Sequence, residues 1–343
     1  MEPGNTMNTQ KRKPNSNLLK YQESNRESFI SCSSALIVHT LRMVTEHENQ
    51  GNNSLCDYMD EMLHSIFFLA YIHDRSLTPS KHFKSSKLCD VVKKKFPGSF
   101  EKYRSHLPTR TPFSILLNMM ETLYHTEEEI KVELLILLQE LNFPYPLHKP
   151  GSKHEQYYTL ESTVICVCSD SGSNSDSTPQ TYFGASLSCR KGNAKRILID
   201  VSCLKTWHEF VSHAVMSFTL EGSGDGITFP ESVKCQAYIR DWNENVYKER
   251  RPCLNCGELF NLNDADPDKV HHPYGNCAET ECLSKLLFNN QHTRKNTRIE
   301  NHTEETLETL RRRTKESLTK QLAQVGIKII NENFLFYSPM QKS

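Results

Sequence analysis

The first half of the chain carries apolar residues at spacings of three and four, which predicts helices. The pattern starts near residue 28 and continues to about residue 148, and an apolar stripe with this period forms the core face of a helix. Thr111-Pro112 is a typical helix start, because a hydroxyl caps free N–H groups and proline suits the first turn. Thr126, followed by three glutamates, is another. We therefore expect an all-α helical domain over residues 26–150, built as a bundle of four or five helices.

After Pro150 the pattern becomes a mixture of strands and helices. Four segments have the β-branched and aromatic content of strands: 163–168, 181–189, 196–201 and 327–337. Four others have helical spacing: 207–220, 233–246, 278–288 and 303–324. Such a mixture predicts an α/β layer. We expect an α/β C-terminal domain over residues 158–343.

The composition of residues 1–25 predicts a disordered tail. They are rich in Asn, Ser, Lys and Pro and contain few side chains that could anchor a core. The stretch has no apolar run, so it does not have the form of a secretory signal. No segment approaches the roughly 20 consecutive apolar residues of a membrane span. We therefore expect a cytoplasmic or nuclear protein without a membrane partner.

Net charge and cysteine content give only weak information about the binding partners of the protein and the role of its cysteines. Lys plus Arg and Asp plus Glu both number 41, so the formal net charge is zero. A neutral chain has no overall attraction to nucleic acid or to an anionic membrane. In a reducing compartment, the twelve cysteines are expected to be thiols or metal ligands and not a disulfide framework.

The segment 252–287 makes the most specific chemical suggestion. It contains Cys253, Cys256, Cys277 and Cys282 within thirty residues. A CxxC pair lets two thiolates converge on one metal ion. Pro252 before the first cysteine suits a helix start, where the positive end of the helix favours thiolate.

The second part of this segment could complete a metal site. Gly275-Asn276 before Cys277 is a plausible turn into a helix, with Asn276 as the cap. Cys253, Cys256 and Cys277 would then supply three zinc ligands and leave the fourth position for water, as a catalytic zinc requires. Glu279, two residues beyond Cys277, could reach that water as a proton shuttle.

These residues resemble the zinc-dependent, cytidine-deaminase-like superfamily. Its members use a His or Cys, any residue and then Glu, together with Pro-Cys-x-x-Cys. Cys277-Ala278-Glu279 is similar to the first element in its cysteine form, and 252–256 is similar to the second. The two elements occur here in reversed order. A permuted chain could restore the geometry, because zinc depends on positions in space and not on chain order.

The resemblance implies both a fold and an activity. The fold would be a cytidine-deaminase-like α/β/α sandwich with Zn²⁺ as cofactor. The activity would be hydrolytic deamination, in which metal-activated water attacks a base and ammonia is released. Glu279 would carry the proton, and Cys253, Cys256 and Cys277 would bind the metal. The substrate would be a nucleobase, a nucleoside or a base within a nucleic acid.

A structural zinc site is the alternative. Cys253 and Cys256 could be joined by two of His271, His272, Cys277 and Cys282, and a closed site with four protein ligands needs no glutamate. Glu279 would then only favour the start of its helix. In that case the chain would be a non-enzymatic interaction or adaptor protein, with the helical domain as the surface for a protein partner. A redox CxxC pair without metal is the third interpretation.

Overall fold

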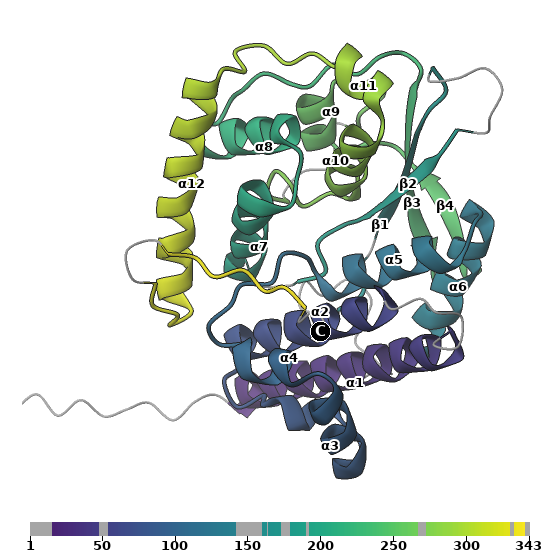
Figure 1. The fold of residues 1–343 in the computed structure, drawn as a ribbon, viewed down its shortest axis with the longest axis vertical. Coiled ribbons are helices and arrows are strands. Elements are labelled where there is room, and N and C mark those ends of the chain that lie inside the picture. Colours follow the sequence, from purple (N-terminus) through teal and green to yellow (C-terminus); the bar gives the residue numbers. More distant parts are fainter. Residues whose placement is uncertain are drawn as a thin grey trace, which may run out of the picture.

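The N-terminal half of the protein is helical. The computed structural model describes residues 16–47, 54–141, 160–162, 164–172, 179–189, 192–266, 272–329 and 333–339 (Figure 1). The elements of this half are α1 (Ser16–His47), α2 (Ser54–His73), the 3-10 helix η2 (Pro79–His82), α3 (Ser86–Lys95), α4 (Pro97–Lys102), α5 (Pro112–Leu123) and α6 (Glu127–Glu140). Helix α1 begins at Ser16, so residues 16–25 of the predicted tail are helical and residues 1–15 lie outside the described part.

Two helix starts in this half were predicted from their caps, and both are confirmed. The Thr111 hydroxyl accepts a hydrogen bond from the Ser114 N–H at the start of α5. Thr126 and Glu129 form a reciprocal capping box at the start of α6. In each case a side-chain oxygen satisfies an N–H group that the helix itself leaves unpaired.

The C-terminal half contains a four-stranded antiparallel sheet and further helices. The strands are β1 (Val164–Asp170), β2 (Thr181–Ala185), β3 (Val233–Asp241) and β4 (Val246–Arg250), in the order β2-β1-β3-β4. The helices are α7 (Gly192–Lys205), α8 (Glu209–Glu221), α9 (Leu254–Phe260), α10 (Ala278–Asn289), α11 (Gln291–Asn296) and α12 (Glu304–Gln324). The prediction of a helical region followed by an α/β region is confirmed at this level.

Helices cover both faces of the sheet. On one face, Ile165, Val167 and Phe183 belong to the hydrophobic cluster of the N-terminal helices. On the other, Cys166 and Tyr182 belong to a second cluster that includes residues of α8, α9 and α10. The alternation follows from the period of two in a strand, which sends successive side chains to opposite faces. The first cluster therefore joins the two halves across the predicted boundary, which itself lies in the undescribed residues 142–159.

Two of the predicted elements in the C-terminal half have the wrong type. Residues 196–201 lie within helix α7 and not in a strand. Every side chain from residue 197 to 203 is buried, so the apolar run hides the helical period. Residues 233–246 form the β3–β4 hairpin and not a helix. The Asp241 carboxylate accepts two backbone N–H groups in its turn, and Asn245 has a positive φ of 49°.

The C-terminal segment also differs from expectation. The predicted strand 327–337 is absent from its described residues, in which Phe336 forms only an isolated bridge to Leu107. Helix α12, in contrast, begins at the predicted Thr303 cap. The stretch Gln22–His47 of α1 has the length and apolar composition of a membrane span, and 61% of its window is buried inside the protein, as in a core helix.

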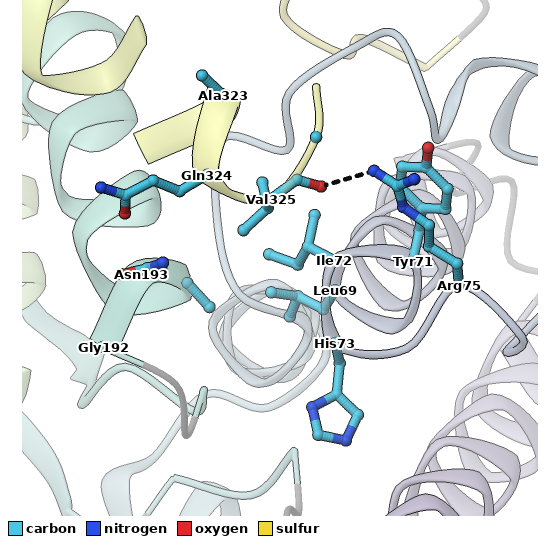
Figure 2. Close-up of a pocket in the computed structure, with 12 residues that line it drawn as sticks. Leu69, Tyr71, Ile72, His73, Arg75, Gly192, Asn193, Ala323, Gln324 and Val325 are labelled. Carbon is cyan, nitrogen blue, oxygen red and sulfur yellow. Dashed lines mark hydrogen bonds between the residues drawn. The ribbon is translucent and has the colours of Figure 1, made fainter. Parts of the chain in front are cut away.

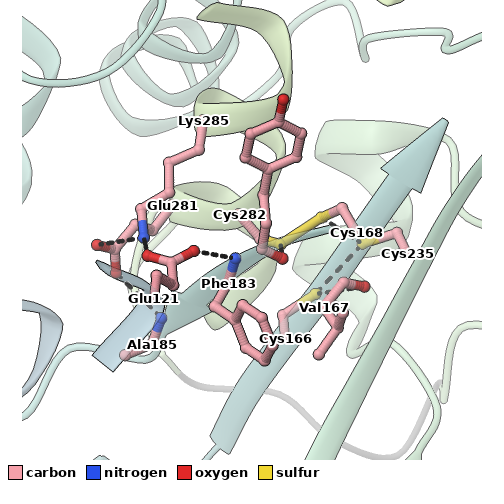
Figure 3. Close-up of a disulfide and its surroundings, with 11 residues drawn as sticks. Glu121, Cys166, Val167, Cys168, Phe183, Ala185, Cys235, Glu281, Cys282 and Lys285 are labelled. Carbon is pink, nitrogen blue, oxygen red and sulfur yellow. Dashed lines mark hydrogen bonds and ion pairs between the residues drawn. A yellow bond between two sulfur atoms is a disulfide. The ribbon is translucent and has the colours of Figure 1, made fainter. Parts of the chain in front are cut away.

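Helix α10 packs directly on strand β2 at Gly184. A Cβ atom at Gly184 would lie 2.3 Å from the carbonyl oxygen of Ala278 and 2.5 Å from the backbone nitrogen of Cys282. The outer edge of β2 is held as well, because the Phe183 N–H donates to Glu121 of α5 and the Ala185 N–H donates to Glu281 of α10. Lys285 of α10 donates to the second oxygen of Glu121 at 2.7 Å (Figure 3). The start of α10 is thereby fixed against the sheet.

Gly184→Ala is expected to destabilise the fold by about 1–3 kcal/mol, because the added methyl group meets backbone atoms that cannot move aside. Urea denaturation of the purified protein measures this change. Gly192→Ala is the matched control, since a Cβ atom there meets nothing within 4 Å. Equal unfolding midpoints for the two variants would contradict the close packing of α10 on β2.

Candidate metal centre

Three cysteines from the motif segment meet at the starts of two helices. Cys253 is the N-cap of α9 and Cys277 is the N-cap of α10, while Cys256 lies in the first turn of α9. The Cys253 sulfur is 3.6 Å from that of Cys256 and 3.4 Å from that of Cys277. All three sulfur atoms lie within 4.8 Å of one another. Residues 24 apart in the chain are therefore brought to one point.

The loops before the helices hold this arrangement. The Asn255 side chain donates to the His272 carbonyl oxygen at 2.8 Å, which ties α9 to the segment before α10. The Leu187 N–H donates to the Asn276 carbonyl oxygen, which ties that segment to the end of β2. Gly275 has a φ of +85° and lies against Trp207, so a side chain there would be strained and crowded. Backbone geometry thus fixes the position of Cys277.

The cap of α10 differs from the prediction. Asn276 was expected to be the N-cap, but Cys277 occupies that position. The side-chain oxygen of Asn276 is buried and has no hydrogen-bond partner in the part of the chain that the structure describes. Cys277 therefore lies at the entrance of the helix, where its hydrogen-bond contact with Cys253 and its burial raise the pKa of its thiol.

Glu279 is buried next to the three thiols. Its side chain is 4% exposed, and its carboxyl group is within hydrogen-bonding reach of the Cys256 thiol and within electrostatic reach of Cys253. Burial raises the pKa of this carboxyl group above its usual range. Glu279 therefore faces the cluster and does not project into solvent from the first turn of α10.

The thiols interact strongly with one another. Hydrogen-bond contacts with Cys256 and Cys277 hold the pKa of Cys253 well below its usual range. The same contacts, together with burial, raise the pKa of Cys256.

The geometry suits a metal ion bound by thiolates. A tetrahedral zinc with Zn–S bonds of about 2.3 Å separates its sulfur ligands by about 3.8 Å, and the observed separations of 3.4 and 3.6 Å need only a small expansion. Among the described residues, the group at this point that could hold an ion consists of Cys253, Cys256 and Cys277. A cluster of this kind could hold a metal ion, and its fourth position is left without a described protein ligand.

The other candidate ligands are placed elsewhere or lie outside the described part. Cys282 forms a disulfide with Cys168 of β1, so its sulfur does not join the three thiols. His272 is exposed and is not a member of the group. His271 lies outside the described residues. Cys282 is buried in the helix–sheet interface because it lies on the inner face of α10, about one turn beyond Cys277.

Three neighbours of the site were not expected from the sequence. Cys166 of β1 interacts electrostatically with Cys277 and Glu279. The Lys195 ammonium group of α7 lies near Cys277, and burial lowers its pKa. Arg250, at the end of β4, is near Glu279. Only Arg250 had a local signal, because it stands two residues before Pro252, whereas the others are distant in sequence.

A small cavity lies beside Cys277, whereas a larger one lies away from the three cysteines. A cavity of about 20 Å³ is lined by Cys277, Gly275 and Trp207 together with residues around the start of α5, and it has room for one water molecule. A larger cavity of about 680 Å³ lies between the ends of α2 and α12 and the start of α7 (Figure 2). Arg75 crosses it to donate to the Val325 carbonyl oxygen. None of the three clustered cysteines lines the larger cavity.

Cys277→Ser is expected to bind one zinc ion per chain fewer than the wild type, because it removes a ligand that no described residue can replace. Metal content after gel filtration, measured by mass spectrometry, gives the count. Cys56→Ser, which changes a thiol of α2 far from the motif segment, should keep the wild-type count. An unchanged count in Cys277→Ser would remove this cysteine from the metal centre.

No protein-family model matches the chain, and no curated protein or solved structure is significantly similar to it. Its fold and its cysteine clusters therefore have to be interpreted from their own residues.

Proposed function

We propose that this protein is a zinc-dependent hydrolytic deaminase that acts on a nucleobase, a nucleoside or a base within a nucleic acid. The observation that carries the proposal is the position of Glu279, a buried carboxyl group beside three thiols that leave one metal position without a described protein ligand. This combination is similar to the ligand set and the non-ligand glutamate of the zinc deaminases. The helices on both sheet faces also agree with a deaminase-like sandwich.

The chain supplies three functions at this site. Cys253, Cys256 and Cys277 hold the metal, and a bound zinc ion acts as a Lewis acid that activates water for attack on the base. Glu279 takes a proton from the attacking water and returns it to the base as ammonia leaves. The α10–β2 packing at Gly184 keeps the carboxyl group and the Cys277 sulfur in a fixed relation, which general acid–base catalysis requires.

We expect substrate to approach from the side of the site that carries Cys253. Cys253 is half-buried, and Arg251, two residues earlier, is exposed. An arginine at this edge could pair with a phosphate group of a nucleotide. The cavity beside Cys277, in contrast, holds a water molecule but is too small for a base.

The structural alternative keeps one observation in its favour. The cavity that the described residues form beside Cys277 is too small for a base, and a site that only joins α9 to α10 needs none. The protein would then be an adaptor with a structural zinc ion. Its helical half would supply the contact surface, where Val132 and Ile136 are exposed one turn apart on α6. This alternative gives Glu279 no chemical role.

Glu279→Gln is expected to lower ammonia release by about 100-fold or more, since the amide cannot shuttle a proton. Zinc content should stay at the wild-type value, because Glu279 is not a member of the ligand group. The assay uses cytidine, adenosine and guanosine, their monophosphates, and single-stranded DNA and RNA oligonucleotides.

The matched control is Glu308→Gln, the same chemical change on the exposed face of α12. It should retain wild-type activity. Equal activity in Glu279→Gln and the wild type would exclude Glu279 from the mechanism. If the zinc-loaded wild-type protein releases no ammonia from any substrate in the panel, the structural alternative is the better explanation.

A further inference from the structure

A second group of cysteine sulfur atoms lies near the candidate metal centre. Strand β1 contributes Cys166 and Cys168, strand β3 contributes Cys235, and helix α10 contributes Cys282 (Figure 3). Cys166 and Cys168 point to the same face because they are two residues apart in a strand. Cys235 is the direct cross-strand partner of Cys168. Three separate elements thus direct four sulfur atoms to one place.

The separations match those of a metal site. The Cys235 sulfur is 3.4 Å from that of Cys166 and 3.9 Å from that of Cys168, and these three lie within 4.8 Å of one another. The edge of a zinc–thiolate tetrahedron is about 3.8 Å. Cys282 belongs to α10, the helix that covers this face of the sheet, and its sulfur reaches the group from the helix side. Cys166, Cys168 and Cys235 are therefore spaced like three corners of a zinc–thiolate tetrahedron, and the disulfide places the Cys282 sulfur next to that of Cys168.

Burial makes this group different from a chance collection of thiols. Cys166, Cys168 and Cys282 are fully buried in the core, whereas Cys235 is only partly buried. The partly buried corner offers an entry path for an ion. The described structure contains the Cys168–Cys282 disulfide, while Cys166 and Cys235 remain as thiols (Figure 3).

We propose that Cys166, Cys168, Cys235 and Cys282 form a second metal site, which binds Zn²⁺ or another thiophilic ion through four thiolates once the Cys168–Cys282 disulfide is reduced. A dithiol reductant supplies two electrons and two protons, the S–S bond breaks to give two thiols, and the reductant becomes a disulfide. Metal binding then displaces the thiol protons. In the oxidised protein the disulfide takes the place of the ion.

The second site has a structural role. Four protein ligands leave no open position for water, so the site is closed. It ties α10 to two strands of the sheet, and the same helix begins with Cys277 and Glu279. Cys166 lies within electrostatic reach of both residues. The second ion therefore stabilises the element that carries the candidate active site, and its binding does not depend on the proposed activity.

Metal counting tests the proposal in the full-length protein. Wild-type protein purified with a dithiol reductant should bind two zinc ions per chain, and protein oxidised before metal loading should bind one. Cys235→Ser should bind one ion under reducing conditions, and Cys56→Ser should bind two. A Cys235→Ser protein that retains the full wild-type count would overturn the second site.

X-ray absorption spectroscopy of Cys253→Ser tests the site without changing any of its ligands. This variant removes the first centre, so the zinc that remains reports only on the second. Four sulfur neighbours at about 2.3 Å are expected. The absence of zinc from the folded, reduced variant, or a coordination shell with fewer sulfur atoms, would refute the proposal. If Cys253→Ser retains both zinc ions, the first centre fails while the second stands.

Discussion

The structure depends on how closely helix α10 approaches strand β2. At Gly184 the helix backbone occupies the space where a side chain would be, so only glycine allows the contact. This contact places the start of α10 over the sheet, where Cys277 meets Cys253 and Cys256 of the preceding motif. Without it, the two parts of the segment would have no fixed relation, and Glu279 would have no reason to be buried beside the thiols.

Two carboxylates accept hydrogen bonds along the outer edge of the same strand. β2 is an edge strand, and unpaired N–H groups at an edge can pair with another chain. Glu121 and Glu281 accept two of these groups, and Lys285 pairs with Glu121 at 2.7 Å. The acceptors come from α5 and α10, so the helical half and the helix that begins at Cys277 both hold the strand. An edge strand is thus converted into the anchor of the candidate site.

The sequence was informative where a local interaction decides the structure. Thr111 and Thr126 predicted helix starts because a cap involves only neighbouring residues. The same reasoning led to three thiols at two helix starts, which the structure brings together. It failed for residues 196–201, where burial on all sides removes the periodic signal. The Cys168–Cys282 pair was also not found, because its sequence separation of 114 becomes a contact only after the sheet has formed.

The shared core of the two halves determines how the chain can be divided. Ile165, Val167 and Phe183 pack against the N-terminal helices, so the candidate catalytic half does not have a complete surface of its own. A chain cut near residue 158 would expose this apolar face and would also free the β2 edge that Glu121 occupies. Both are sites of aggregation. The helical half therefore covers the apolar face and the β2 edge of the sheet, and the two halves are expected to be stable only together.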